Sequence, residues 1–309
     1  MQSRREFLRD ALVGAGLGAG ALVLAGCSKT DSPQRLEGVQ QLKYGPSTSQ
    51  IGELLVPDGK GPFPVVVLIH GGWWRVGWDR RAGRELARDL RKHGYATWNL
   101  DYRLVGEPGG GWPGTFEDIA TGIDSLLDHA NEYGLDLARL VFLGHSAGGQ
   151  LALWAAARDE FPHGAVGAGP RLLPNTVVAQ APVTDLALAA EWNLGKDAVQ
   201  HLLGGSPEQV PERYRLASPI DLVPMKPPQF LIHAVDDDIV PIAQSQLYAK
   251  AARAKHDQVE FVEIPSGGHY WLIDVSGDAW RTVRDRMGEF STRPQIVPTT
   301  TAPATTTTG

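Results

Sequence analysis

Short apolar runs alternate along the chain with longer segments of helical periodicity. The runs are rich in Val, Ile, Leu and Phe and have the length of strands buried on both faces. These predicted strands span residues 65–69, 95–100, 140–143, 176–181, 230–235 and 259–264. Predicted helices lie between them, at residues 80–92, 116–132, 149–157, 242–254 and 277–290. Such alternation predicts an α/β fold, a mostly parallel sheet with helices on both faces.

The remaining segments divide the chain further. Residues 40–56 predict an antiparallel hairpin at the edge of the sheet. Residues 185–224, broken by Gly and Pro, predict a small cap insertion, with a plain surface excursion as the alternative. A polar tether at 28–36 precedes one folded domain at 37–292, and a Thr/Pro-rich tail at 293–309 is expected to be disordered.

Composition limits the kinds of partner. The 309 residues are 42% hydrophobic and 21% charged, the balance of an ordinary globular protein with a sizeable core. A net charge of −6 and a sequence pI near 5.8 provide no basic surface to hold phosphate backbones, so no nucleic-acid partner is expected.

The first 27 residues predict an export signal. Basic residues precede an apolar run at 11–25, which is too short and too glycine-rich to be a dependable membrane span. Ser3-Arg4-Arg5-Glu6-Phe7-Leu8 resembles the twin-arginine motif of proteins exported in the folded state. The alternative is generic positive charge ahead of an apolar stretch.

Cys27 is the single cysteine of the chain, which excludes an internal disulfide and a cysteine-based zinc site. Leu24-Ala25-Gly26-Cys27 resembles the lipobox of bacterial lipoproteins, in which the cysteine is lipidated. This resemblance implies an exported protein of the bacterial cell envelope, anchored to a membrane through lipid on Cys27. An ordinary cleavage site with an incidental cysteine is the alternative.

Gly144-His145-Ser146-Ala147-Gly148 follows one predicted strand and precedes a predicted helix. This is the context of the G-x-S-x-G nucleophile elbow, a tight turn that exposes a serine hydroxyl at a helix N-terminus. Glycines on both sides let the neighbouring backbone pass without Cβ clashes. The motif predicts Ser146 as a catalytic nucleophile.

A serine hydroxyl needs a base to take its proton and an acid to orient that base. His269 follows the last predicted strand, in the loop Gly267-Gly268-His269-Tyr270. Asp236, Asp237 and Asp238 stand at the carboxyl end of the strand before it, where sites in such sheets collect. Successive side chains point in opposite directions, so at most one of the three is expected to face the histidine.

An oxyanion hole is predicted after the first parallel strand, where His70-Gly71-Gly72-Trp73-Trp74 matches an HGG-type loop. Its glycines free backbone amides to point at a developing negative charge. The amide of Ala147 would supply one donor. The second would come from Gly72 or Trp73, because Trp73 stands where many esterases have a third glycine.

These motifs together resemble serine esterases of the α/β-hydrolase superfamily, in the bacterial kynurenine-formamidase and feruloyl-esterase-like group. The resemblance covers about residues 45–290 and implies the α/β-hydrolase fold. In the family's H-G-x-x-D-x-x-V-P spacing the triad acid is Asp237, although Ala234 stands where the family has glycine. The matching segments are residues 70–74, 101–103, 111–114, 144–149, 237–241 and 268–269.

The resemblance implies hydrolysis of carboxylic esters, including aryl esters or aryl-formamides, through an acyl-enzyme and with no metal or organic cofactor. The partner is then a small-molecule ester or amide substrate. One alternative is a serine peptidase similar to the catalytic domain of prolyl oligopeptidases, whose usual gating domain does not fit in this length. The other is a non-catalytic envelope lipoprotein that uses a hydrolase fold for binding.

Several tryptophans fall in the predicted active-site loops, which suggests an aromatic substrate pocket containing Trp74, Trp112 and Trp271, with Trp73 and Trp78 nearby. A place in the core is the alternative for each. Asp101-Tyr102-Arg103 is interpreted as a structural hydrogen-bonded corner rather than a substrate clamp.

Overall fold

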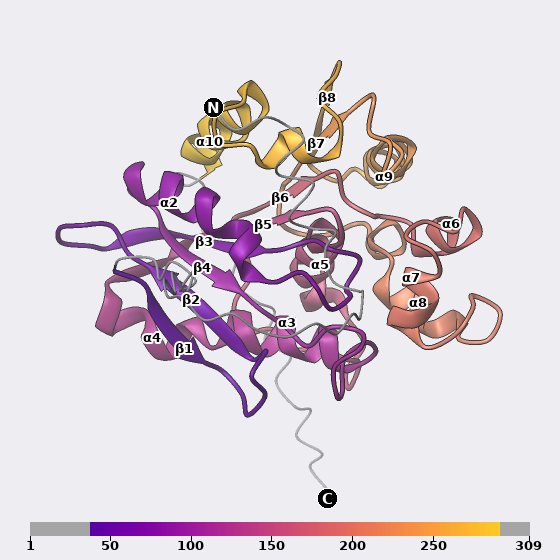
Figure 1. The fold of residues 1–309 in the computed structure, drawn as a ribbon, viewed down its shortest axis with the longest axis horizontal. Coiled ribbons are helices and arrows are strands. Elements are labelled where there is room, and N and C mark those ends of the chain that lie inside the picture. The colour runs from indigo at the N-terminus through magenta and orange to yellow at the C-terminus, as the bar shows by residue number, and fades with distance from the viewer. Residues whose placement is uncertain (1–37, 291–309) are drawn as a thin grey trace, which may run out of the picture. The chain divides into compact units, whose positions relative to one another are not determined.

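A computed structural model describes residues 38–290 of the protein (Figure 1). The predicted export signal with Cys27, the tether at 28–36 and the tail at 293–309 lie outside the described residues. Between residues 38 and 290, no helix is long and apolar enough to cross a membrane.

One sheet of eight strands organises the described residues, in the order β1-β2-β4-β3-β5-β6-β7-β8. The first two strands pair antiparallel at one edge, β2 pairs antiparallel with β4, and all other pairs are parallel. The strands are β1 (Gln40–Lys43), β2 (Ile51–Leu55), β3 (Phe63–Ile69), β4 (Ala96–Leu100), β5 (Leu135–His145), β6 (Thr176–Gln180), β7 (Gln229–Ala234) and β8 (Val259–Ile264).

The predicted parallel strands and the edge hairpin are confirmed, and their boundaries agree within two residues except at the start of β5. β5 begins at Leu135 rather than at residue 140, because its first half pairs with the start of β3 across a register shift between Pro64 and Val65. Residues 136–139 are partly exposed there. They therefore lack the continuous apolar run that marks the rest of the strand.

Helices cover both faces of the sheet, and Figure 1 shows α2 and α10 on one side and α3, α4 and α5 on the other. Alternate side chains of β3 explain the two layers. Val66 and Leu68 pack in the core that includes α2 and α10, whereas Val65 and Val67 pack in the core that includes α3 and α5. The long helices are α2 (Arg84–Lys92), α3 (Gly114–Asp124), α4 (Leu126–Tyr133), α5 (Ala147–Ala156), α9 (Ala243–Ala254) and α10 (Asp278–Phe290).

Two predicted helices are interrupted in the structure. The segment 80–92 begins as a 3-10 helix, η1 (Arg80–Gly83), before α2. The segment 116–132 is broken at Ser125 into α3 and α4. The Ser125 hydroxyl donates to the carbonyl of Gly122 at 2.8 Å, a local bond of the kind that competes with regular helix geometry.

The predicted cap, residues 185–224, folds into α6 (Leu186–Glu191), α7 (Ala198–Leu203), α8 (Pro211–Ala217) and the 3-10 helix η3 (Pro219–Leu222). Its buried side chains, among them Leu202 and Tyr214, belong to the same core as α5. The amide of Trp112, in the loop after β4, donates to the carbonyl of Leu202 at 2.7 Å. The insertion therefore packs against loops at the carboxyl ends of the strands.

Candidate active site

Ser146 occupies a strained turn between a strand and a helix. β5 ends at His145 and α5 begins at Ala147, and between them Ser146 has φ 59° and ψ −123°. A non-glycine residue at positive φ is uncommon and costs energy, which the surrounding structure must offset. The amide of Ser146 is held by the carbonyl of Gln180, at the end of β6, at 2.8 Å.

Glycine is required on both sides of the elbow because backbone atoms fill the space that a side chain would need. A Cβ at Gly144 would lie 2.0 Å from the carbonyl oxygen of Gly148, and a Cβ at Gly148 would lie 2.0 Å from that of Ile69. No real Cβ makes such contacts. The G-x-S-x-G pattern thus records how closely the elbow packs against the end of β3.

Asp237 and His269 form a buried pair. The Asp237 Oδ2 and His269 Nδ1 atoms are 2.7 Å apart, and the two residues are 8% and 4% exposed. Because an ionised carboxylate only accepts hydrogen bonds, Nδ1 carries the proton and donates it. The Nε2 atom of His269 is then left with a lone pair, as a general base requires.

The other two candidate aspartates do not occupy this position. Asp236 and Asp238 are exposed, and no contact joins either to the ring of His269. Asp236 accepts hydrogen bonds from the amides of Gly268, at 2.8 Å, and Gly267, at 3.1 Å. These bonds hold the pKa of Asp236 below its usual value and fasten the loop that carries His269.

Further hydrogen bonds fix the carboxylate of Asp237. Its Oδ1 accepts the amides of Ile239 and Val240, both at 2.9 Å. Its Oδ2 also lies 3.1 Å from Nε2 of His233, a fully buried ring whose Nδ1 faces the hydroxyl of Ser245. Burial alone would raise the pKa of Asp237, but the bonds from His233 and His269 outweigh it, so the pKa lies well below the usual range.

His145 contacts the loop that carries His269. Its Nε2 lies 2.9 Å from the backbone carbonyl of His269, and the two rings are 4.5 Å apart. Burial, reinforced by the neighbouring His269, lowers the pKa of His145 to about 3. The ring is therefore neutral near pH 7 and donates its Nε2 proton to that carbonyl. Sequence patterns gave no sign of this contact or of the His233 contact.

The loop after β3 holds three consecutive residues at positive φ, Gly72 at 112°, Trp73 at 54° and Trp74 at 55°. Within residues 38–290, the amides of Gly72 and Trp73 donate no hydrogen bond. Ala147 is the first residue of α5, so its amide has no acceptor within the helix. The amides of the three predicted oxyanion donors thus form no hydrogen bond within residues 38–290. The choice between Gly72 and Trp73 as the second donor stays a prediction.

The Asp101-Tyr102-Arg103 segment makes structural contacts with this loop and with neighbouring segments. Tyr102 donates its hydroxyl to the carbonyl of His70 at 2.8 Å, and its ring stacks on the His70 ring at 4.5 Å. Asp101 accepts the amide of Arg80 at 2.7 Å, and Arg103 binds both carboxylate oxygens of buried Asp118. These contacts agree with a hydrogen-bonded corner.

Ser146 and His269 line one small cavity of about 40 Å³. Aromatic rings form much of its wall, and the rings of Trp78 and Tyr270 stack at 6.2 Å and remain 42% and 41% exposed. The lining residues are Gly71, Gly72, Trp73, Trp78, Ala82, His145, Ser146, Ile239, His269, Tyr270 and Ile273.

The prediction that Trp74, Trp112 and Trp271 form the substrate pocket needs correction. Trp74 is fully buried and donates its indole proton to Gln150 at 3.0 Å, so it cannot line a pocket. Trp112 packs against the core and lies 5.0 Å from the ring of Phe116. Trp271 is 36% exposed but does not line the cavity of Ser146. The aromatic wall comes instead from Trp73, Trp78 and Tyr270.

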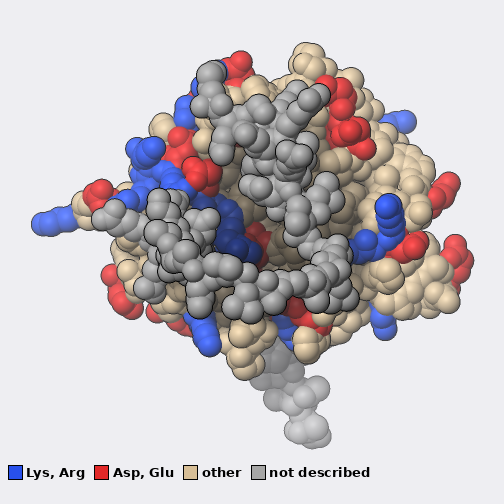
Figure 2. All heavy atoms as spheres, in the orientation of Figure 1, with Lys and Arg blue, Asp and Glu red and all other residues tan. Residues whose placement is uncertain are grey.

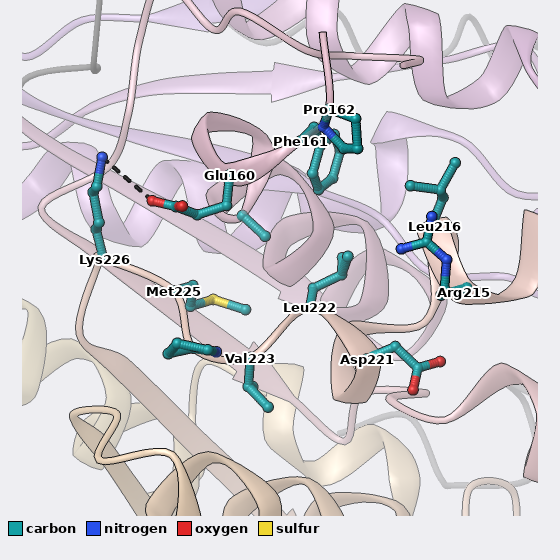
Figure 3. Close-up of a pocket in the computed structure, with 12 residues that line it drawn as sticks. Glu160, Phe161, Pro162, Arg215, Leu216, Asp221, Leu222, Val223, Met225 and Lys226 are labelled. Atoms are coloured by element: carbon teal, nitrogen blue, oxygen red, sulfur yellow. Dashed lines mark ion pairs between the residues drawn. The ribbon is translucent and has the colours of Figure 1, made fainter. Parts of the chain in front are cut away.

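A larger cavity of about 440 Å³ lies elsewhere, between the C-terminal end of α5 and the segment that leads into β7 (Figure 3). This is the amino-end side of the sheet, opposite Ser146. Phe161, Leu222 and Met225 line it together with charged groups, among which Lys226 pairs with Glu160 at 3.3 Å. Neither Ser146 nor His269 reaches it, so it is not the catalytic cavity.

The surface carries charges of both signs. On the face drawn in Figure 2, basic and acidic side chains lie beside one another around the rim, and further basic side chains lie left of the centre. No group of three or more His, Cys, Asp or Glu side chains among the described residues is arranged to hold a metal ion.

A mostly parallel sheet with a nucleophile elbow after a central strand, and an acid and a histidine after later strands, is the α/β-hydrolase fold. Within this fold the chain belongs to the BD-FAE family, an esterase family whose model matches residues 54–251. The resemblance inferred from the motifs is thereby confirmed.

Curated relatives include esterases of Mycobacterium tuberculosis. The chain is 29% identical to "Esterase LipC" over 226 residues. This alignment covers 69% of this chain and 54% of LipC. It is also 29% identical over 231 residues to "Esterase LipQ", covering 72% of this chain and 52% of LipQ. The chain therefore spans about half the length of these relatives.

Solved structures support the fold. A "Truncated form of carbohydrate esterase from gut microbiota" matches with a TM-score of 0.71 at 21% identity, over 82% of this chain and 95% of that one. Esterase B from Lactobacillus rhamnosis matches with a TM-score of 0.69 at 24% identity, over 82% of this chain and 85% of that one. At these identities the likeness shows a shared fold alone.

The buried, neutral His145 predicts an acid-sensitive fold. The pKa of an unfolded histidine is near 6.5, whereas burial lowers the pKa of His145 in the folded protein to about 3. Between these values the unfolded state binds a proton that the folded state does not, so the free energy of unfolding falls as the pH falls through this window. In His145→Gln, this fall between pH 6.5 and 5.5, measured by urea unfolding, should be smaller by about 1 kcal/mol.

The exposed His163 provides the control, since His163→Gln should leave the pH dependence of unfolding unchanged. Equal losses of stability in the parent and in His145→Gln would show that His145 is not held neutral.

Proposed function

We propose that the protein is a serine carboxylesterase that hydrolyses small esters through an acyl-enzyme. The observation that carries the proposal is that Ser146, in its strained elbow, and His269, oriented by Asp237, line the same cavity. The esterase relatives and the family support this class of reaction.

In the proposed reaction, His269 Nε2 takes the Ser146 proton as the hydroxyl attacks the substrate carbonyl. The imidazolium that forms is stabilised by Asp237 and then protonates the leaving group. The amides of Ala147 and of Gly72 or Trp73 stabilise the negative oxygen of the tetrahedral intermediate. Water, activated by the same histidine, hydrolyses the acyl-enzyme and frees Ser146.

The cavity favours short acyl groups. Its volume is about 40 Å³, less than a tenth of the 440 Å³ of the cavity beside the C-terminal end of α5, which leaves little room for a long acyl chain. The exposed rings of Trp78 and Tyr270 offer flat apolar surface to an aromatic leaving group. Aryl esters and aryl-formamides with small acyl groups are therefore the proposed substrates.

The first test is covalent labelling together with turnover. The purified protein should react with a fluorophosphonate probe and hydrolyse p-nitrophenyl acetate faster than the octanoate, because the longer chain exceeds the cavity. Ser146→Ala should lose both labelling and turnover, while Ser276→Ala, at an exposed serine away from the cavity, should keep them. An unlabelled, inactive protein would point to a binding role, and faster turnover of peptides than of every ester would point to a peptidase.

The second test concerns the acid. Asp237→Asn keeps the shape of the side chain but favours the wrong tautomer of His269, which in a serine protease triad lowers turnover about 10⁴-fold. Asp238→Asn changes an exposed carboxylate without a contact to His269, and kcat should stay within about tenfold of the parent. Loss of turnover in Asp238→Asn with normal turnover in Asp237→Asn would reassign the acid.

We further propose that the protein is exported and anchored to a membrane of the bacterial cell envelope through lipid on Cys27. The lipobox-like Leu24-Ala25-Gly26-Cys27 and the twin-arginine-like start of the chain support this location. In a bacterial host, the full chain should sediment with membranes, and Cys27→Ser should move it to the soluble fraction. Ser28→Ala is the control. Cys27→Ser protein that still sediments with membranes would rule out the lipid anchor.

A further inference from the structure

The turn between α6 and α7 is strained. Asn193, Lys196 and Asp197 have φ values of 52°, 54° and 57°, and Gly195 has 64°. Residues with side chains seldom adopt such conformations, and of the four residues Lys196 is the one that tolerates them least. The turn is therefore expected to depend on contacts from outside the insertion.

Arg75, two residues after Trp73 in the oxyanion loop, supplies such contacts. One of its terminal nitrogens donates to the carbonyl of Gly195 at 2.7 Å. The other donates to the carbonyl of Lys196 and lies 2.9 Å from Nδ1 of His201, on α7. Because a guanidinium group only donates, His201 accepts. One side chain thus joins both ends of the turn to the loop after β3.

Trp73 makes a second contact with the same turn. A Cβ built on Gly195 would lie 2.5 Å from the Trp73 ring, so the indole packs directly against the backbone of that glycine. The same indole lines the cavity of Ser146. The position of the turn consequently determines where this wall of the cavity stands.

The backbone of Arg75 closes the oxyanion loop itself. Its amide donates to the carbonyl of Gly72 at 3.1 Å, and the carbonyl of Trp74 accepts the amide of Val105 at 2.7 Å. These bonds flank the residues at positive φ, including Trp73, where a glycine would adopt the conformation more easily. Movement of Arg75 would therefore move the candidate oxyanion donors.

We propose that Arg75 is a positioning residue that holds the oxyanion loop in its active geometry by fastening it to the insertion. The insertion is then part of the machinery that stabilises the transition state, rather than only a cover. This inference rests on the proposed esterase function, since it concerns the oxyanion donors of that reaction.

Steady-state kinetics on p-nitrophenyl acetate tests the inference. Loss of one oxyanion donor in a serine protease lowers kcat about 10²- to 10³-fold, so displacement of the loop in Arg75→Met should lower kcat by about tenfold or more. KM should stay within about threefold, because these donors act mainly in the transition state. Arg75→Lys keeps a donor that can reach one carbonyl and should recover part of kcat.

Arg213→Met is the matched control. Arg213 donates to the carbonyl of Leu203 at 2.8 Å, a bond that lies wholly inside the insertion. Its loss should lower stability without changing kcat. Thermal unfolding of each variant shows that the protein compared is folded.

Gly195→Ala approaches the same contact from the opposite side. The added methyl group meets the Trp73 ring, and kcat should fall with little change in KM. Gly204→Ala introduces similar strain, at φ 77°, but its methyl group meets only the end of the Arg213 side chain, so kcat should stay near the parent value. This pair separates displacement of Trp73 from general damage to the insertion.

A kcat equal to that of the parent in both Arg75→Met and Gly195→Ala would overturn the inference. A change in KM alone would also overturn it. The same holds if kcat falls equally in the two controls, Arg213→Met and Gly204→Ala. These outcomes require an active parent enzyme. A parent that hydrolyses no ester would instead refute the proposed function, and the inference with it.

Discussion

Close packing of backbone against backbone at the nucleophile elbow is the constraint on which the site depends. The turn at Ser146 brings the start of α5 against the end of β3, so near that a Cβ at Gly148 would lie 2.0 Å from the carbonyl oxygen of Ile69. The amide of Ala147 therefore lies close to the oxyanion loop, which begins at His70. Strain at Ser146 is offset by the hydrogen bond to Gln180 and by the parallel strands on both sides of β5.

The polar groups around His269 all favour the same protonation state of its ring. Asp237 is ionised and accepts from His269, so Nδ1 of His269 carries a proton and Nε2 does not. His145 is neutral, because its buried ring would otherwise carry an unpaired charge beside His269. A positive charge there would also disfavour the imidazolium of His269 that the proposed reaction needs. Burial of His145 thus serves the same protonation state that the hydrogen bonds of Asp237 impose.

Sequence patterns were sufficient for the sheet and for the residues with chemical motifs, because strand periodicity and the elbow are local properties. They pointed to Ser146 and His269, which the structure places on one cavity, and family spacing selected Asp237, the aspartate that the structure places against His269. They failed where long-range packing decides. Trp74 and Trp73 are adjacent in the sequence, yet one is fully buried and the other lines the cavity. The roles of His145, His233 and Asp236 likewise depend on partners that only the folded chain brings together.

Trp73 in place of a third glycine links these observations. A glycine would adopt the positive φ of this position without strain but would leave the cavity without one wall. The tryptophan supplies that wall, and its strained backbone then requires contacts that a glycine would not need. The ring packs on Gly195, where any side chain would collide, and Arg75 secures the same turn from the other side. A residue that shapes the substrate cavity therefore also makes the oxyanion loop depend on the insertion, which explains why the two segments are joined by such specific contacts.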